Sequence, residues 1–319
     1  MFSVTLILTL LGAFTTLSFA TPVKRTVSHG AVINRDFPDP GIMRNSDGVW
    51  YAYSTSSSSG LVPMSNSTDF QKWTTPTNVL ASIGPWATGT VWAPDVRRIT
   101  PGHYVMYYTA RRKGGPSNDH CIGIATASYP AGPFNPHAHP LICDLAHGGV
   151  IDASGFEAPG GGLYVLWKVG GNSIGKPTPI KIQHVGADGY TLLGKSTTLI
   201  TNDPVDGGVV EAPSMIYWDG WYYLFFSSNV YSTLKYDISY AVSRSVTGPF
   251  KKVHAPNAPF LVTGKFGTAG PGGATAINVE NKYVNMAFHS DINGKNSSGG
   301  RAMWTVSNVC LGNGVAKAC

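Results

Sequence analysis

Charged residues are scarce in this chain of 319 residues, and those present do not gather by sign. Asp, Glu, Lys and Arg make up only 13% of the sequence, and the longest basic run is Arg111–Lys113. Because nucleic-acid binding needs a concentrated basic face, we interpret the net charge of +6 as a contribution to solubility. Low charge together with 38 glycines is more typical of an all-β secreted protein than of a helical cytosolic one.

Long apolar runs are equally rare. The stretch Val4–Phe14 is mostly apolar but too short and too rich in Thr for a membrane anchor. Small residues in Ser18–Ala20 fit a signal-peptide cleavage site, although no Lys or Arg precedes the apolar part. We therefore predict a secretory signal peptide over residues 1–20, a short propeptide over 21–25, and a secreted, extracellular domain over 26–319 that does not contact a membrane.

Cysteine occurs only four times and never as C-x-x-C, which argues against a cysteine metal site. An even count in a secreted chain predicts two disulfides, for which three pairings exist. Proximity along the chain favours Cys121–Cys143 and Cys310–Cys319. Two sequons, at Asn66 and Asn296, are candidates for N-glycosylation on surface loops.

The motifs of several common enzyme chemistries are missing as well. The sequence contains no G-x-S-x-G, no H-E-x-x-H, no P-loop and no dinucleotide fingerprint. No segment of any length has the 3.6-residue period of an amphipathic helix either. The candidate strands are short and bounded by Gly, Pro, Asn or Asp.

What the sequence does contain is a repeated aromatic strand. Runs rich in Trp, Tyr and Phe recur about every 60 residues, a period typical of β-propeller blades. The five runs are Gly48–Ser54, Gly102–Ala110, Gly162–Val169, Gly220–Ser227 and Lys282–His289. We therefore predict an all-β fold, a five-bladed β-propeller with four antiparallel strands per blade. The alternative is a β-sandwich whose strands share this spacing by coincidence.

The segment before each aromatic run is predicted to be the innermost strand of its blade, next to the axial channel. These segments are short and rich in Gly and Pro, as crowding near the axis requires: Asp36–Met43, Val91–Arg97, Val150–Phe156, Val209–Met215 and Thr268–Ala274. A second repeat aligns Ile124–Phe134 with Tyr240–Phe250 and predicts a third strand with the turn into the fourth. The large aromatic side chains are expected to pack between neighbouring blades.

Acidic residues stand at nearly the same distance ahead of three aromatic runs: Asp39, Asp152 and Glu211. Side chains at one phase of a radial repeat should converge on the axis. Glu211 lies among Val and Ala residues, where an ionisable group needs a partner or an altered proton affinity. Convergent carboxylates indicate either a cation site or glycoside hydrolysis, in which one carboxyl is the acid, another is the base, and a third favours protonation of the acid.

An Ala-Pro step shared by blades two and four aligns Trp92 with Glu211 and Asp95 with Ser214. If Glu211 faces the channel, strand alternation places Trp92 in the channel too and turns Asp95 away. Trp92 then becomes a candidate platform for a sugar ring. Asp95 is expected to be structural, paired with an Arg nearby or with backbone N–H groups.

At these residues the chain resembles glycoside hydrolase family 43, five-bladed propeller enzymes that act on arabinose and xylose polymers. The resemblance runs from about Val32 to Val309. Four motifs carry it in order at blade spacing: PDP at Pro38–Pro40, WAPDV at Trp92–Val96, VIDAS at Val150–Ser154 and VEAPS at Val210–Ser214. It implies that Asp39 is the general base, Glu211 the general acid and Asp152 the modulator of the acid, in a reaction that inverts anomeric configuration.

The resemblance also suggests binding residues. Arg301 matches an Arg that grips sugar hydroxyls in some members, and the other substrate-binding candidates are Phe37, Trp92 and Asn172. Many arabinan-cleaving members have a His after G-P-G that ligates an axial ion, whereas Gly273 stands there in this chain. His289 is then the remaining candidate for a metal ligand. No cofactor is implied for the chemistry, and only an axial structural calcium is left open.

The single domain and the stretch Trp167–Gln183 are most similar to α-L-arabinofuranosidase members. We therefore expect a monomeric, exo-acting enzyme that trims arabinan or arabinoxylan fragments of the plant cell wall. An endo-1,5-α-L-arabinanase is the alternative if the channel mouth is an open groove, and a β-xylosidase is another, although many of these add a second domain. A non-catalytic carbohydrate-binding propeller would not need three acids in phase, and the related fructan-cleaving enzymes usually carry an R-D-P motif that does not occur at Ala93–Val96.

Overall fold

The computed structural model describes Met1 and residues 25–294 and 297–319, and its regular structure is almost entirely β-strand. Apart from Met1 and Arg25, the predicted signal peptide and propeptide lie outside the described residues, as does the sequon at Asn296. Within the described residues, no helix is long and apolar enough to cross a membrane.

The strands form five antiparallel sheets, the blades of a propeller, numbered here in chain order. Blade one contains β2 (Gly41–Arg44), β3 (Trp50–Tyr53), β4 (Pro63–Ser67) and β5 (Thr77–Asn78). Blade two contains β6 (Ala87–Thr100), β7 (His103–Arg112), β8 (His120–Ala127), β9 (Asn135–Pro136) and β10 (Ile142–Cys143). Blade three contains β11 (Val150–Glu157), β12 (Leu163–Val169), β13 (Ile180–Val185) and β14 (Leu192–Ile200). Blade four contains β15 (Val210–Trp218), β16 (Trp221–Ser228), β17 (Asp237–Ser243) and β18 (Lys251–Lys252).

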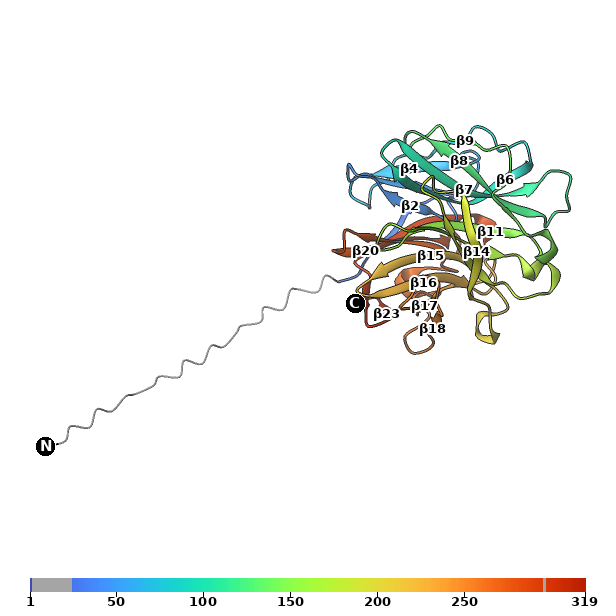
Figure 1. The fold of residues 1–319 in the computed structure, drawn as a ribbon. Helices are drawn as coiled ribbons and strands as arrows, with labels where there is room; N and C mark the ends of the chain where they lie inside the picture. The colour runs from blue at the N-terminus through green and yellow to red at the C-terminus, as the bar shows by residue number, and fades with distance from the viewer. Residues whose placement is uncertain (2–24, 295–296) are drawn as a thin grey trace.

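Blade five is built from both ends of the chain. It contains β19 (Gly272–Val279), β20 (Tyr283–Asp291), β21 (Arg301–Ser307) and, as its outermost strand, β1 (Val27–Ile33). In Figure 1 the red strands of this blade lie beside the blue strands of blade one. The predicted five-bladed propeller is thus confirmed, with one extra short strand in blade two, and the first strand of the chain closes the ring.

Short elements complete the chain. A terminal hairpin is formed by β22 (Cys310–Gly312) and β23 (Val315–Lys317). The single-turn 3-10 helices are η1 (Leu145–His147), η2 (Gly171–Ile174), η3 (Pro204–Asp206), η4 (Lys265–Gly267) and η5 (Ser297–Gly299). Both predicted disulfides are present: Cys121–Cys143 joins β8 to β10, and Cys310–Cys319 ties the end of the chain to the terminal hairpin.

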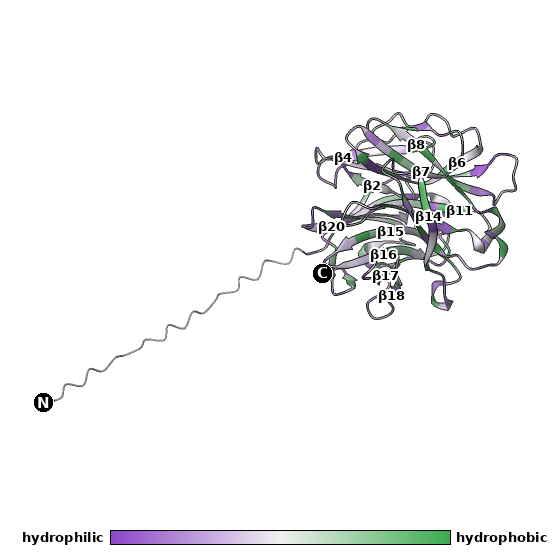
Figure 2. Ribbon diagram, in the orientation of Figure 1, coloured by the Kyte–Doolittle hydropathy of each residue, from purple (hydrophilic) through white to green (hydrophobic). Residues whose placement is uncertain are grey.

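The core consists of five apolar clusters, one at each interface between neighbouring blades. Their largest members come from the predicted aromatic strands β3, β7, β12, β16 and β20, as in the fully buried Tyr53, Tyr108, Tyr223 and Phe288. Figure 2 shows the apolar residues along the strands and the polar ones mainly in the loops. Each such side chain contributes about 1.5–3 kcal/mol by burial, so the interfaces between blades hold the ring together.

The innermost strands share one irregularity that the sequence analysis did not foresee. In blades two to five the pairing register between the first and second strands shifts by a two-residue bulge near the axis. The first residue of the bulge, and the equivalent residue of blade one, has a positive φ: Asp39 (51°), Ala93 (42°), Asp152 (57°), Ala212 (50°) and Gly273 (57°). Such bulges bend a strand and re-aim its side chains, and here they do so toward the channel.

Because of the bulges, the three acidic residues do not occupy the one common position of the repeat that the sequence analysis predicts. Asp39 and Asp152 occupy the first bulge position themselves, whereas Glu211 and Trp92 come one residue before it. The three carboxylates therefore reach the axis from two different backbone positions rather than from one. The predicted equivalence of Trp92 and Glu211 agrees with the observed register.

The sequence analysis predicts a loop at the sequon of Asn66, and the structure shows that this is wrong. Asn66 is on β4, where its carbonyl accepts the N–H of Thr74 and its own N–H donates to Thr74 Oγ1 at 3.0 Å. Its side chain is half-buried. Whether this asparagine is glycosylated stays a prediction.

Removing β1 should open the ring. A chain that begins at Asn34 lacks the ladder that joins β1 to β21, and it leaves the apolar outer face of blade five uncovered. We expect its melting temperature, measured by circular dichroism, to fall by roughly 10 °C or more, since several kcal/mol of pairing and burial are lost. A chain that begins at Thr26 is the control and should melt like the full sequence; equal melting of the two chains would contradict closure by β1.

Candidate active site

The three predicted catalytic carboxylates open onto one cavity of about 350 Å³ at one end of the propeller axis. All five blades contribute to its lining: Asp39, Thr55, Trp92, Asp152, Lys168, Asn172, Glu211, Tyr231, Tyr236 and Arg301. Beneath it, at the level of the bulges, the channel narrows to a space of about 30 Å³, which has room for roughly one water molecule. The cavity therefore has a floor built from the backbones of the innermost strands.

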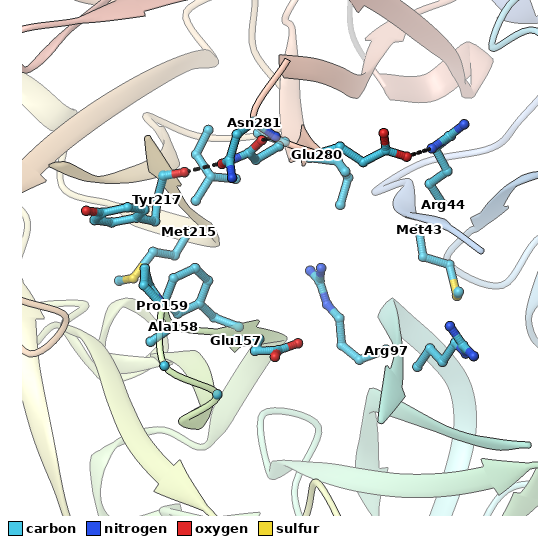
Figure 3. A pocket seen from close by; sticks show the side chains of 18 residues that line it. Met43, Arg44, Arg97, Glu157, Ala158, Pro159, Met215, Tyr217, Glu280 and Asn281 are labelled. Atoms are coloured by element: carbon cyan, nitrogen blue, oxygen red, sulfur yellow. Dashed lines mark hydrogen bonds and ion pairs between the residues drawn. The ribbon is translucent and has the colours of Figure 1, made fainter. Parts of the chain in front are cut away.

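The opposite mouth of the channel forms a separate cavity of about 610 Å³. Figure 3 shows side chains of all five blades around it, among them Met43, Arg97, Glu157, Met215 and Glu280. These residues lie farther along the same innermost strands, beyond the narrow point. Arg44 pairs with Glu280 at 2.9 Å, and Arg97 pairs with Asp95, so most of the charge at this end is neutralised.

Asp39 is held as a carboxylate. Its Oδ1 lies 3.1 Å from Arg301 Nη1, and its Oδ2 accepts a hydrogen bond from Thr55 Oγ1 at 2.7 Å. Burial alone raises the pKa of Asp39, but Arg301, His289 and Thr55 outweigh burial and hold this pKa well below the usual carboxyl range. An ionised carboxylate beside open space is the form that a general base requires.

Asp152 has the opposite character. Its Oδ2 accepts the N–H of Ala212 at 3.0 Å, and its own N–H donates to Thr109 Oγ1 at 3.0 Å. Burial and the negative charge of Glu211 raise the pKa of Asp152 to about 7, against the opposing attraction of Lys168. Near neutral pH the carboxyl of Asp152 therefore keeps its proton for much of the time.

Glu211 is gripped at both carboxylate oxygens. Lys168 Nζ donates to Oε2 at 2.7 Å, and the hydroxyl of Tyr236 donates to Oε1 at 2.8 Å. The sequence analysis missed both partners. Lys168 had a signal, since it is the only charged residue in the run Gly162–Val169, whereas Tyr236 lies in a loop without any distinctive pattern.

Two exposed aromatic side chains flank the cavity. Trp92 of blade two is 38% exposed and stacks on His120 with ring centroids 4.2 Å apart. Tyr231 of blade four, which the sequence analysis did not single out, is 48% exposed and lies beneath the Arg301 guanidinium. Blades two and four are not neighbours in a five-membered ring, so the two aromatics stand on opposite sides of the axis.

The remaining binding candidates fall in different places. Asn172 lies on η2 at the exposed rim of the cavity, and Arg301 lines the cavity but is also an ion-pair partner of Asp39. Phe37 is completely buried in the core between blades five and one. A side chain without accessible surface cannot touch a sugar, so Phe37 is not a substrate-binding residue.

Asp95 is turned away from the cavity, as predicted. It forms a two-point ion pair with Arg97, at 2.7 Å to Nε and 2.9 Å to Nη2, and accepts the N–H of Gly155 at 2.8 Å. This buried cluster links blades two and three below the site.

His289 reaches the axis, but its surroundings do not fit a metal ligand. Its Nδ1 accepts the N–H of Asp39 at 3.1 Å, and its Nε2 lies 3.5 Å from Arg301 Nη1. A guanidinium beside Nε2 occupies the approach that a cation would need, and among the described residues no group of three His, Cys, Asp or Glu side chains is arranged to hold a metal ion. No chemical role is therefore assigned to an axial calcium ion.

Steric crowding explains why a glycine stands at position 273. A Cβ at this position would lie 2.7 Å from His289 Nδ1 and 2.9 Å from Asp39 Oδ1, and the residue has a positive φ. The space beside Asp39 is thus occupied by the His289 ring, which stacks on Tyr236 with an interplanar angle of 8°.

A five-bladed propeller whose axial cavity holds three carboxyls, of which Asp39 is held ionised and Asp152 has a raised pKa, has the parts of an acid–base glycosidase. Residues 29–305 match the family model described as glycosyl hydrolases family 43, and the chain belongs to this family. The resemblance inferred from its motifs is thereby confirmed, and the protein is a glycoside hydrolase.

Known relatives are moderately similar. The chain is 28% identical over 285 residues to the extracellular endo-α-(1→5)-L-arabinanase 1 of Bacillus subtilis (strain 168), covering 80% of this chain and 81% of the relative. It is 28% identical over 207 residues to a probable arabinan endo-1,5-α-L-arabinosidase C of Aspergillus flavus, covering 60% and 58% of the two chains. A crystal structure of a thermostable family-43 glycoside hydrolase superposes with a TM-score of 0.76 at 23% identity, covering 88% of this chain and 92% of that chain.

Gly272 should be essential for the grip on Glu211. A Cβ at this glycine would lie 1.9 Å from Cε1 of Tyr236, so Gly272→Ala must push the Tyr236 ring away from Glu211. We expect a lower melting temperature and a fall in kcat of roughly tenfold or more, because a displaced hydrogen-bond partner misplaces the carboxyl. The control is Gly312→Ala, where nothing lies within 4 Å, and unchanged kinetics in both variants would contradict this role.

Proposed function

We propose that the protein is an endo-acting α-L-arabinanase that cleaves 1,5-linked arabinan, rather than the exo-acting arabinofuranosidase expected from the sequence. The Bacillus relative is an endo-1,5-α-L-arabinanase by name, and the Aspergillus flavus relative is a probable one. The exposed Trp92 and Tyr231 on opposite sides of the axis support the same proposal. An enzyme that cuts within a chain must hold sugar rings on both sides of the bond, and aromatic faces suit that purpose.

The observation that carries the glycosidase mechanism is the convergence of the three carboxyls Asp39, Asp152 and Glu211 on one cavity. In the reaction, Asp39 removes a proton from a water molecule whose oxygen attacks the anomeric carbon. The bond from that carbon to the leaving oxygen breaks, its electron pair stays on the oxygen, and Glu211 supplies the proton. Donation requires the proton of the site to be on Glu211, and the negative charge that Asp152 carries once it has given up its own proton favours that arrangement. One displacement of this kind inverts the anomeric configuration.

Arg301 has a double task in this proposal. It holds the charge of Asp39 from one side, and its guanidinium lines the cavity where sugar hydroxyls would lie. A planar cation with several donors can bind both at once. Asn172 at the rim is a further candidate for polar contact with the substrate.

Secretion and the natural substrate are also part of the proposal. The predicted signal peptide over residues 1–20 and the two disulfides are typical of an exported protein. The Bacillus relative is described as extracellular. We infer that the protein acts outside the cell as a monomer on plant cell-wall arabinan and its fragments.

The products of linear 1,5-arabinan should distinguish the candidate activities. We expect early release of a mixture of arabino-oligosaccharides and a rapid loss of viscosity. The products are measured by chromatography and by proton NMR of their anomeric signals. Arabinose alone from the first time point would support the exo-acting alternative. Xylose from xylo-oligosaccharides, with arabinan untouched, would support the xylosidase.

Matched variants make this assay specific for the site. Glu211→Gln should lower kcat by roughly 10²- to 10⁴-fold, because general acid catalysis contributes about that much. The control is Glu157→Gln at the opposite mouth of the channel, which should leave activity unchanged. Similar activity of both variants would remove Glu211 from the acid role.

The pH profile should reflect the proton held at Asp152. Because the raised pKa of Asp152 is about 7, the site keeps this proton below that pH and loses it above, so kcat/KM should decline as pH rises through about 7. Asp152→Asn removes the negative charge that favours protonation of its partner, and the basic limb should move to lower pH.

Asp237→Asn is the control for this shift. Asp237 is also buried and accepts hydrogen bonds from Ser228 and Ser239, but it does not line the cavity. The basic limb of the kcat/KM profile of Asp237→Asn should coincide with that of the unchanged protein. If this limb does not move in Asp152→Asn, the modulator role is contradicted.

A further inference from the structure

Five side chains at equivalent positions surround the axis at the level of the bulges. Each stands on or at the end of the second strand of its blade, opposite the residue that precedes the bulge. They are Thr55, Thr109, Lys168, Ser227 and His289, and we call them the belt residues. The belt lies directly beside the three carboxylates.

Four belt residues perform the same task. Each accepts the backbone N–H of the bulge residue in the next blade: Thr55 from Ala93 at 2.8 Å, Thr109 from Asp152 at 3.0 Å, Ser227 from Gly273 at 2.9 Å and His289 from Asp39 at 3.1 Å. A bulge leaves its amide without a partner in the ladder, and a buried amide needs an acceptor. The belt thus fastens each bulge to the neighbouring blade.

Lys168 breaks the pattern. An ammonium group has donors only, so it cannot accept the N–H of Ala212, the bulge residue of the next blade. That N–H goes to Asp152 Oδ2 instead, at 3.0 Å, while Lys168 Nζ reaches past it to Glu211 Oε2 at 2.7 Å. One change in the belt therefore brings Asp152 beside the backbone of blade four and places a cation on Glu211.

The burial of Lys168 makes a merely structural role costly. Its side chain is 2% exposed, and taking an ammonium out of water costs several kcal/mol, which a hydroxyl at the same belt position would avoid. The other charged or titratable groups around Glu211 are contributed by every adjoining element: Asp39, Asp152, Tyr236, His289 and Arg301. None of these groups places a positive charge in direct contact with Glu211, whereas Lys168 does.

We propose that Lys168 is a positioning residue for proton donation, which fixes the Glu211 carboxyl and stabilises the carboxylate left when its proton passes to the leaving oxygen. This inference rests on the proposed function, in which Glu211 is the acid. Asp152 and Lys168 then act in opposite directions on the same carboxyl. Asp152, once it is ionised, favours the proton-bearing form of Glu211 before the reaction, and the Lys168 cation favours the ionised form that the reaction produces.

The opposition predicts shifts of opposite sign in the pH profile. Lys168→Met keeps the length of the side chain but removes its charge, so the ionised acid loses its partner. The basic limb of kcat/KM should move upward by about 1 to 3 pH units, opposite to the shift expected for Asp152→Asn. The loss of kcat should be roughly tenfold or more with arabino-oligosaccharides, and smaller with an aryl arabinoside whose leaving group needs little protonation.

Two further variants keep the test decisive. Lys168→Thr introduces the residue that blades one and two carry in the belt, offers Ala212 an acceptor, and should give the same upward shift if the methionine variant does not fold. Lys252→Met removes another buried ammonium, paired with Asp203 and Asp206 away from the cavity, and should leave the limb in place.

The outcomes separate this inference from the proposed function. A uniform loss of kcat at every pH, without movement of the basic limb and equal for both leaving groups, would reduce Lys168 to a structural residue while Glu211→Gln still shows the acid. An active Glu211→Gln variant would instead overturn the function itself. A shift in Lys168→Met that is absent in Lys252→Met supports the inference.

Discussion

The buried amide at each bulge is the constraint on which this structure depends. Five strands meet at one axis, and each must bend there to avoid its neighbours, which takes one backbone N–H out of the ladder. The partner comes from the adjacent blade, either a belt residue or, in one case, the carboxylate of Asp152. The hydrogen bonds that link neighbouring blades around the axis therefore also orient the side chains of the site.

The carboxyls of the site differ in proton affinity because they have different partners. Asp39 and Asp152 are both desolvated, which by itself would favour the neutral acid. Arg301 and Thr55 reverse this effect for Asp39, whereas Asp152 has one backbone donor and a negative neighbour. Two aspartates at the same bulge position thus differ strongly in proton affinity because of what the neighbouring blades present to them.

The sequence predicted the repeat, the blades, the disulfides and the residues that reach the cavity, because each of these depends on spacing or chain proximity. It could not predict the bulges, since a positive φ at Ala93 or Asp152 follows from crowding at the axis rather than from residue type. Tyr236 was missed because it comes from a loop without a repeat signal, and Thr55 because it lies one residue beyond the first predicted aromatic run. Phe37 was misassigned because neighbours of a catalytic motif alternate between cavity and core, and its burial depends on blade five.

The closure of the ring by β1 has a consequence for biosynthesis. Thr26 and Asn308, which are hydrogen-bonded in the closed ring, are 282 residues apart along the chain. At the usual speed of translation, about 5–20 residues per second, the first strand waits roughly 15 to 55 seconds for its partner to be made. During synthesis the chain is thus an open row of blades with two unpaired edges, and it becomes an enzyme only when its last residues arrive.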